Sequence, residues 1–140
     1  MRLDHIGIAV SNLNEADTLI ARLLGRQPYK RETVADQHVT TSFFSAGATD
    51  AKLEFVAPAG DAGPIHKYLE KRGPGLHHLA FEVDDIRTEM KRLAADGFRL
   101  LSEEPSRGAD NKLVCFLHPK STGGVLVEIC QSVPPVTSVP

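Results

Sequence analysis

The chain has 140 residues, of which 41% are hydrophobic and 24% charged, and its formal net charge is −2. This composition is typical of one soluble globular domain, and the near-neutral charge argues against a nucleic-acid-binding surface. No apolar run approaches the roughly 20 residues that span a bilayer, and the first residues lack a basic-then-apolar targeting pattern. Cys115 and Cys130 lie in apolar, strand-like runs, which predicts buried free thiols and a cytoplasmic protein.

The first half of the chain predicts a strand, a helix and three further strands. The alternating stretch L-D-H-I-G-I-A-V leads into a helix whose apolar residues recur at Leu13, Ala16, Ile20 and Leu24. Gly25 follows this helix as a stop signal. The five predicted elements cover residues 3–10, 12–24, 27–33, 38–45 and 52–58.

A linker separates this half from a second half with the same order of elements. Pro64 opens a short helix in the linker, and three prolines after the last strand predict a loose tail. The predicted elements of the second half cover residues 76–83, 85–95, 99–102, 112–117 and 124–131. We therefore expect a single α+β domain of two tandem βαβββ modules. Its parts are module one at about 2–59, the linker at 60–75 with its helix at 65–71, module two at 76–131 and the tail at 132–140.

The two halves also match residue by residue. His5 in the first strand corresponds to His78 in the sequence G-L-H-H-L-A-F, and Leu53-Glu54-Phe55 corresponds to Val127-Glu128-Ile129 at nearly the same offset. Two markers at nearly one offset indicate an internal repeat, which is the signature of a fold built from similar units.

Strand alternation predicts which histidine of the His77-His78 pair has a chemical role. Alternate side chains of a strand share a face, so His78 lies on the same face as Ala80, and His5 on the same face as Gly7. These small neighbours leave space beside each imidazole. Alternation places His77 and its counterpart Asp4 on the other, helix-covered face, which predicts a structural role for His77.

Glu54 and Glu128 are the carboxylates that lie within the two apolar strands. A glutamate that faces an interior is costly unless it is paired or bound to a metal. Two histidines and two glutamates, one of each from each repeat, form a ligand set that suits Co²⁺, Mn²⁺, Ni²⁺, Fe²⁺ or Zn²⁺. The alternatives are hydrogen-bonded structural histidines and glutamates that face water. The pairing by repeat favours the metal site.

At these residues the chain resembles the vicinal oxygen chelate superfamily, and within it the family of methylmalonyl-CoA epimerases. The motifs that carry the resemblance are L-D-H-I-G-I-A-V, K-L-E-F-V-A-P, G-L-H-H-L-A-F-E-V-D-D-I and F-L-H-P-K-S-T-G-G-V-L-V-E. The resemblance implies a cupped, mostly antiparallel sheet around a cleft with one divalent metal ion. It places the metal ligands at His5, Glu54, His78 and Glu128.

The resemblance also implies an activity, which is epimerisation of methylmalonyl-CoA at C2 through a metal-stabilised enolate. Glu128 and Glu54 are then the catalytic bases on opposite faces of an acyl-CoA thioester substrate. Thr41 stands where some epimerases have a glutamate base, and Lys120 and Ser121 lie in a loop that could line the substrate site. A homodimer is the family's habit. The alternatives are a lactoylglutathione lyase of the glyoxalase I type and a non-catalytic protein that binds a small molecule.

Overall fold

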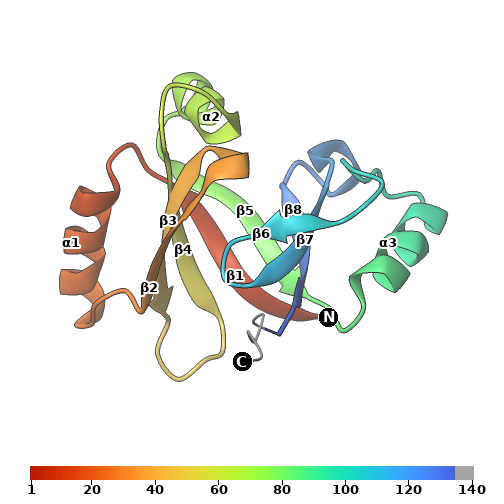
Figure 1. The fold of residues 1–140 in the computed structure, drawn as a ribbon, viewed down its shortest axis with the longest axis horizontal. Helices are drawn as coiled ribbons and strands as arrows, with labels where there is room; N and C mark the ends of the chain where they lie inside the picture. The colour runs from red at the N-terminus through yellow and green to blue at the C-terminus, as the bar shows by residue number, and fades with distance from the viewer. Residues whose placement is uncertain (135–140) are drawn as a thin grey trace, which may run out of the picture.

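Eight strands form a single mixed sheet in the order β2-β3-β4-β1-β5-β8-β7-β6 (Figure 1). The computed structural model describes residues 1–134. The strands are β1 (Arg2–Ala9), β2 (Lys30–Val34), β3 (Val39–Ser45), β4 (Lys52–Pro58), β5 (Gly75–Glu82), β6 (Ser106–Gly108), β7 (Lys112–Leu117) and β8 (Val127–Ser132). The α-helices are α1 (Leu13–Leu24), α2 (Pro64–Arg72) and α3 (Ile86–Ala95), and short 3₁₀ helices cover Ala35–Gln37 and Pro119–Ser121.

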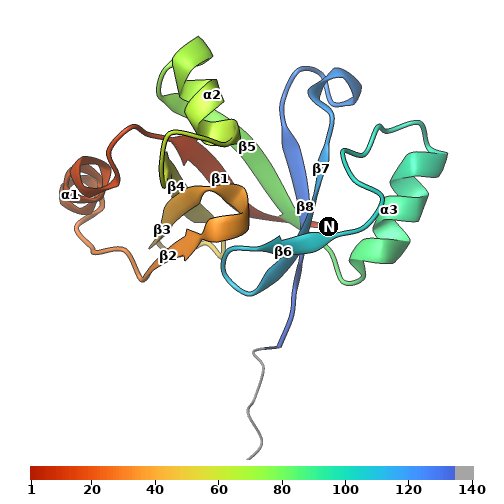
Figure 2. The ribbon, with the colours of Figure 1, turned by 45° about the horizontal axis from the view of Figure 1, so that its top comes forward.

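Each half of the chain contributes four neighbouring strands to this sheet. In each half the first strand pairs in parallel with the last, β1 with β4 and β5 with β8, and the remaining strand pairs are antiparallel. The sheet is strongly curved, and α1 and α3 lie outside it at opposite ends (Figure 2). The predicted α+β fold with a cupped, mostly antiparallel sheet is confirmed.

The two module helices cover the outer face of the sheet. Asn12 caps α1 by accepting a hydrogen bond from the backbone N–H of Glu15, and Asp85 caps α3 in the same way through Thr88. The apolar stripe of α3 packs on strands β7 and β8, and Leu13 of α1 packs on β3 and β4. Because the helices take the outer face, the inner face stays free to form a cleft. No helix within residues 1–134 is both long and apolar enough to cross a membrane.

The structure tests three predictions of local structure that were made from the sequence. Cys115 and Cys130 are buried free cysteines, as expected. The strand predicted at 99–102 is wrong, since only Leu100 forms a bridge, with Leu117, and the edge strand β6 begins after Pro105. Proline has no N–H to donate, so pairing with β7 starts beyond it. Strand β8 also runs through Ser132, where a tail was expected, and residues 135–140 lie outside the described part.

The central pair β1–β5 contains two irregularities of register. Leu3 pairs with Phe81 and His5 with Ala80, so Asp4 is an extra residue in β1. Gly7 pairs with His78 and Ile8 with Leu76, so His77 is an extra residue in β5. Both positions are therefore β-bulges, and they are equivalent in the repeat. The prediction that alternation hides His77 under a helix is wrong, because a bulge turns it into the cavity of the inner face.

Candidate metal centre

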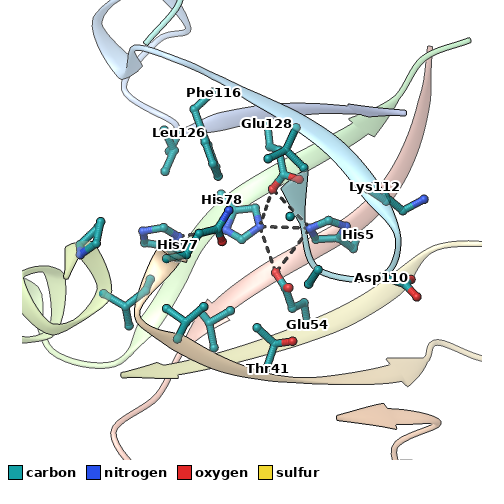
Figure 3. A pocket seen from close by; sticks show the side chains of 18 of the residues that line it. His5, Thr41, Glu54, His77, His78, Asp110, Lys112, Phe116, Leu126 and Glu128 are labelled. Carbon is teal, nitrogen blue, oxygen red and sulfur yellow. Dashed lines mark hydrogen bonds and ion pairs between the residues drawn. The ribbon is translucent and has the colours of Figure 1, made fainter. Parts of the chain in front are cut away.

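A cavity of about 340 Å³ lies on the inner face of the sheet and receives side chains from both modules (Figure 3). Its polar lining includes His5 and His78 on the two central strands, together with Glu54 and Glu128. Its apolar lining includes Val39, Phe43, Val56, Ile65, Val114, Phe116 and Leu126. The cavity is therefore a mainly apolar pocket with one polar cluster, which is the usual form of a small-molecule site.

Four buried side chains converge in this cluster. Nε2 of His5 and Nε2 of His78 lie 3.1 Å apart. Oε1 of Glu54 lies 3.5 Å from the first nitrogen and 3.3 Å from the second. Oε2 of Glu128 lies 3.6 Å and 3.3 Å from the same two atoms. Figure 3 shows the two carboxylates approaching the pair of imidazoles from opposite sides.

The strand register explains why these four side chains meet. Strand β4 pairs with β1 so that Glu54 lies opposite Gly7, and β8 pairs with β5 so that Glu128 lies opposite Ala80. Each glutamate thus stands beside a small residue two positions after a histidine. The structure brings together the residues that the repeat predicted.

The donor set fits a divalent cation. Within residues 1–134, neither glutamate of the cluster forms an ion pair with a lysine or arginine. Burial lowers the pKa of His5, but its hydrogen bonds and the nearby charges of Glu128 and Glu54 outweigh this and raise the pKa to about 10. His5, Glu54 and His78 each offer one ligand atom, and these atoms lie within 4.8 Å of one another, close enough to bind one metal ion. The nearby carboxylates make the centre of the cluster negative, which favours a positive charge there.

Gly7 provides the space that the ring of His78 occupies. A Cβ atom at this position would lie 2.0 to 2.5 Å from three atoms of that ring, which is far inside contact distance. Close approach of this kind is a common reason for glycine inside a strand.

We expect Gly7→Ala to displace the imidazole of His78 and to weaken binding of Co²⁺ roughly tenfold or more, as loss of a supporting contact does at metal sites. Titration with Co²⁺ against a coloured chelator measures this. Gly60→Ala is the matched control, because a Cβ there meets no atom within 4 Å. Equal affinities in the two variants would contradict the role of Gly7.

Of the other predicted site residues, Thr41 lines the cavity, whereas Lys120 and Ser121 do not. Thr41 lines the cavity, is 1% exposed, and its hydroxyl has no hydrogen-bond partner among the described residues. Lys120 and Ser121 lie in a short helical turn and are not among the residues that line the cavity. Ser121 donates its hydroxyl hydrogen to the carbonyl of His118. A role of these two residues in substrate binding stays a prediction.

Sequence reasoning missed a charged group behind the site. Lys112 is buried, and its Nζ lies 3.4 Å from Oδ1 of Asp4. Burial lowers the pKa of Lys112, but the charge of Asp4, together with that of Glu82 and other nearby groups, outweighs this, so the pKa is raised. Burial raises the pKa of Asp4, yet its hydrogen bonds to His5 and Lys52 hold it below its usual range. A lysine at the start of an alternating strand was the only signal in the sequence.

The turn between β6 and β7 connects the two edges of the sheet. Asp110 in this turn donates its backbone N–H to Oε1 of Glu32 on β2, at 2.9 Å. Its carboxylate accepts a hydrogen bond from Nζ of Lys30 at 3.3 Å. Because Gly108, Ala109 and Asp110 line the cavity, these contacts fix one wall of it.

Replacing Glu32 by alanine removes the acceptor for the Asp110 N–H. We expect this amide to exchange with solvent deuterium roughly two- to tenfold faster, which corresponds to the ~0.5–1.5 kcal/mol that one hydrogen bond contributes. Amide exchange followed by NMR measures the rate. Glu32→Gln keeps an acceptor oxygen and should change the rate little, so acceleration in both variants would contradict this explanation.

Comparison with known proteins identifies the class. Residues 4–116 match the family model of the Glyoxalase/Bleomycin resistance protein/Dioxygenase superfamily. The chain belongs to this superfamily, which is the glyoxalase-like fold expected from the sequence.

Within the superfamily, several of the similar proteins are epimerases. The ethylmalonyl-CoA/methylmalonyl-CoA epimerase of Cereibacter sphaeroides is 40% identical over 93% of this chain and 97% of its own. The crystal structure of methylmalonyl-CoA epimerase from Mycobacterium tuberculosis has a TM-score of 0.92 and 35% identity, covering 99% of this chain and 92% of that one. A methylmalonyl-CoA epimerase in complex with methylmalonyl-CoA and NH4+ has a TM-score of 0.87 and 30% identity, with 94% of both chains covered. The resemblance predicted from the motifs is confirmed.

Proposed function

We propose that this chain is a metal-dependent epimerase that inverts C2 of methylmalonyl-CoA. The observation that supports this most directly is the convergence of Glu54 and Glu128 on one pair of imidazole nitrogens inside an apolar cavity. The similarity to epimerases along nearly the whole chain supports the choice of substrate.

The reaction requires a base on each face of the substrate. The C2 proton lies between a thioester carbonyl and a carboxylate, and it must leave one face and return to the other. Glu128 and Glu54 come from different modules and approach the cluster from opposite sides. We assign Glu128 to one face and Glu54 to the other, each accepting or returning the proton at a carboxylate oxygen.

The same cluster would hold the cofactor. The residues that would bind it are His5, Glu54, His78 and Glu128. A divalent ion there supplies Lewis-acid stabilisation of the negative charge that develops on the substrate oxygens. Co²⁺, Mn²⁺, Ni²⁺ and Zn²⁺ all suit two imidazoles and two carboxylates.

The cavity walls contribute binding and exclusion of water. Phe43 and Phe116 flank the imidazoles of His5 and His78 with edge-to-face ring contacts, and both line the cavity. An apolar wall strengthens electrostatic interactions with the developing charge. The unpartnered hydroxyl of Thr41 is available to donate a hydrogen bond to a substrate oxygen. The cavity has room for the acyl group, so we assign Lys120 and Ser121 to the part of the CoA that extends beyond it.

A paired assay tests the proposal. Purified protein is analysed for metal and then given either methylmalonyl-CoA or methylglyoxal with glutathione. We expect interconversion of the methylmalonyl-CoA epimers, loss of activity with a chelator and recovery with added metal. Turnover of the hemithioacetal alone would replace the proposal with a lactoylglutathione lyase, and no turnover of either with a binding protein.

We also propose a homodimer and a cytoplasmic location. Leu3 and Leu76, on the central strand pair, are 40% and 72% exposed, which supports a further apolar contact there. The two buried free thiols support a reducing compartment. We expect sedimentation analysis to give the mass of two chains; the mass of a single chain would contradict the homodimer.

A further inference from the structure

Each histidine of the metal cluster is contacted on its far side by the residue directly before it. Nδ1 of His5 lies 2.7 Å from Oδ2 of Asp4, and Nδ1 of His78 lies 2.9 Å from Nδ1 of His77. The Nε2 atoms of both histidines face the centre of the cluster. Figure 3 shows His77 beside His78, on the side away from His5.

The two bulges make these contacts possible. In a regular strand, neighbouring side chains point to opposite faces, so a residue could not reach the ring of the next one. Asp4 and His77 are the extra residues of their strands, which re-aims each of them toward the histidine that follows. The same device therefore occurs once in each repeat.

A histidine that binds a metal through Nε2 must carry its proton on Nδ1, and a hydrogen-bond acceptor there fixes that tautomer. The carboxylate of Asp4 can only accept. Its other oxygen, Oδ1, receives a hydrogen bond from Nζ of Lys52 at 3.0 Å and lies 3.4 Å from Nζ of Lys112. The two lysines thus hold the carboxylate in place and leave Oδ2 for His5.

His77 can accept in the same way when its own proton is on Nε2. Its ring is held by an edge-to-face contact with Tyr68, with centroids 4.8 Å apart. Tyr68 is itself fixed by donating its hydroxyl hydrogen to the carbonyl of Leu76 at 2.6 Å. The orientation of His77 is therefore set from the linker helix.

We infer that Asp4 and His77 are repeat-related positioning residues, which keep the proton of His5 and His78 on Nδ1 and so present both Nε2 atoms to the metal. The inference rests on the proposed metal centre. It goes beyond that centre because it assigns a function to two residues outside the ligand set, and because it makes the β-bulges part of the site.

Asp4→Asn gives the sharper test. The two lysines would hold the amide oxygen, and the amide NH₂ would then face Nδ1 of His5. An NH₂ group favours the tautomer with the proton on Nε2, the atom that faces the cluster, so this nitrogen could no longer bind a metal. We expect Co²⁺ affinity to fall roughly 10- to 100-fold, as at other sites that lose such a partner. Asp17→Asn is the matched control, since this half-buried carboxylate bonds to Ser42 on the other side of the sheet.

Substitutions of His77 separate positioning from packing. His77→Phe keeps an aromatic ring without an acceptor, and we expect it to weaken Co²⁺ binding roughly tenfold. His77→Asn restores an acceptor oxygen close to the position of Nδ1 and should recover most of the affinity. The measurements are the Co²⁺ dissociation constant, the visible spectrum of the Co²⁺-loaded protein and the melting temperature without metal.

The outcomes distinguish the two claims. Weaker Co²⁺ binding by Asp4→Asn and His77→Phe with an unchanged metal-free melting temperature, and recovery in His77→Asn, is the expected result. Unchanged affinity and spectrum in both variants, or equal losses in His77→Phe and His77→Asn, would overturn the inference while the metal centre stands. Absence of Co²⁺ binding by the unaltered protein would overturn both.

Discussion

Replacing His78 by alanine is expected to abolish tight metal binding and, with it, turnover of methylmalonyl-CoA. The imidazole nitrogen lies 3.1 to 3.3 Å from the other three polar groups of the cluster, so its loss removes a donor from the centre. Loss of a residue that merely supports a ligand costs up to about 100-fold in affinity, so loss of the ligand itself should exceed this. Competition of the protein with a chelator for Co²⁺ measures the affinity.

The control for this experiment is His66→Ala. His66 lies on α2, where it pairs with Glu70 at 3.2 Å, and its removal should leave Co²⁺ affinity unchanged. If His78→Ala bound Co²⁺ as tightly as His66→Ala, the proposed metal centre would be wrong.

The second large effect concerns the two glutamates. In Glu54→Gln or Glu128→Gln the metal retains an oxygen ligand, but one face of the substrate loses its base. We expect interconversion of the epimers to fall roughly 10²- to 10⁴-fold, which is the usual contribution of a general base. One epimer should still exchange its C2 proton for solvent deuterium, with its configuration retained.

Mass spectrometry of the product measures the deuterium, and metal analysis of each variant shows whether the ion is still bound. Glu70→Gln, the same change at an exposed carboxylate that pairs with His66 on α2 and does not line the cavity, serves as the control. If Glu54→Gln turned over and exchanged both epimers as the unaltered protein does, Glu54 would not be a base.

The sequence predicted the centre of the site better than its surroundings. The two glutamates and the two histidines were recognisable because the repeat presents each pair twice, and a coincidence of two markers is detectable in one chain. Lys112 and Asp110 carried no such signal. Their roles depend on which distant strand they meet, Asp4 in one case and the edge strand β2 in the other.

The misplacement of His77 has a specific cause. Strand alternation assumes an uninterrupted ladder, and a single extra residue reverses the face of its neighbours. Neither extra residue is a glycine or a proline; they are an aspartate and a histidine. The repeat did contain a signal for the bulges, because Asp4 and His77 stand directly before the matched histidines of the two halves.

The two bulges lie on opposite strands of the same pair, and this links the shape of the protein to its chemistry. The pair Leu3–Phe81 before the His5–Gly7 segment and the pair Ile8–Leu76 after it have the same register. The second bulge therefore cancels the one-residue shift that the first bulge introduces. A bulge also increases the local twist of a sheet. Asp4 and His77, which we propose orient the metal ligands, thus also stand where extra twist of the sheet is expected. A change that made the ladder regular would flatten the wall of the cavity while it released the ligands, so the enclosure and the metal site would be lost together.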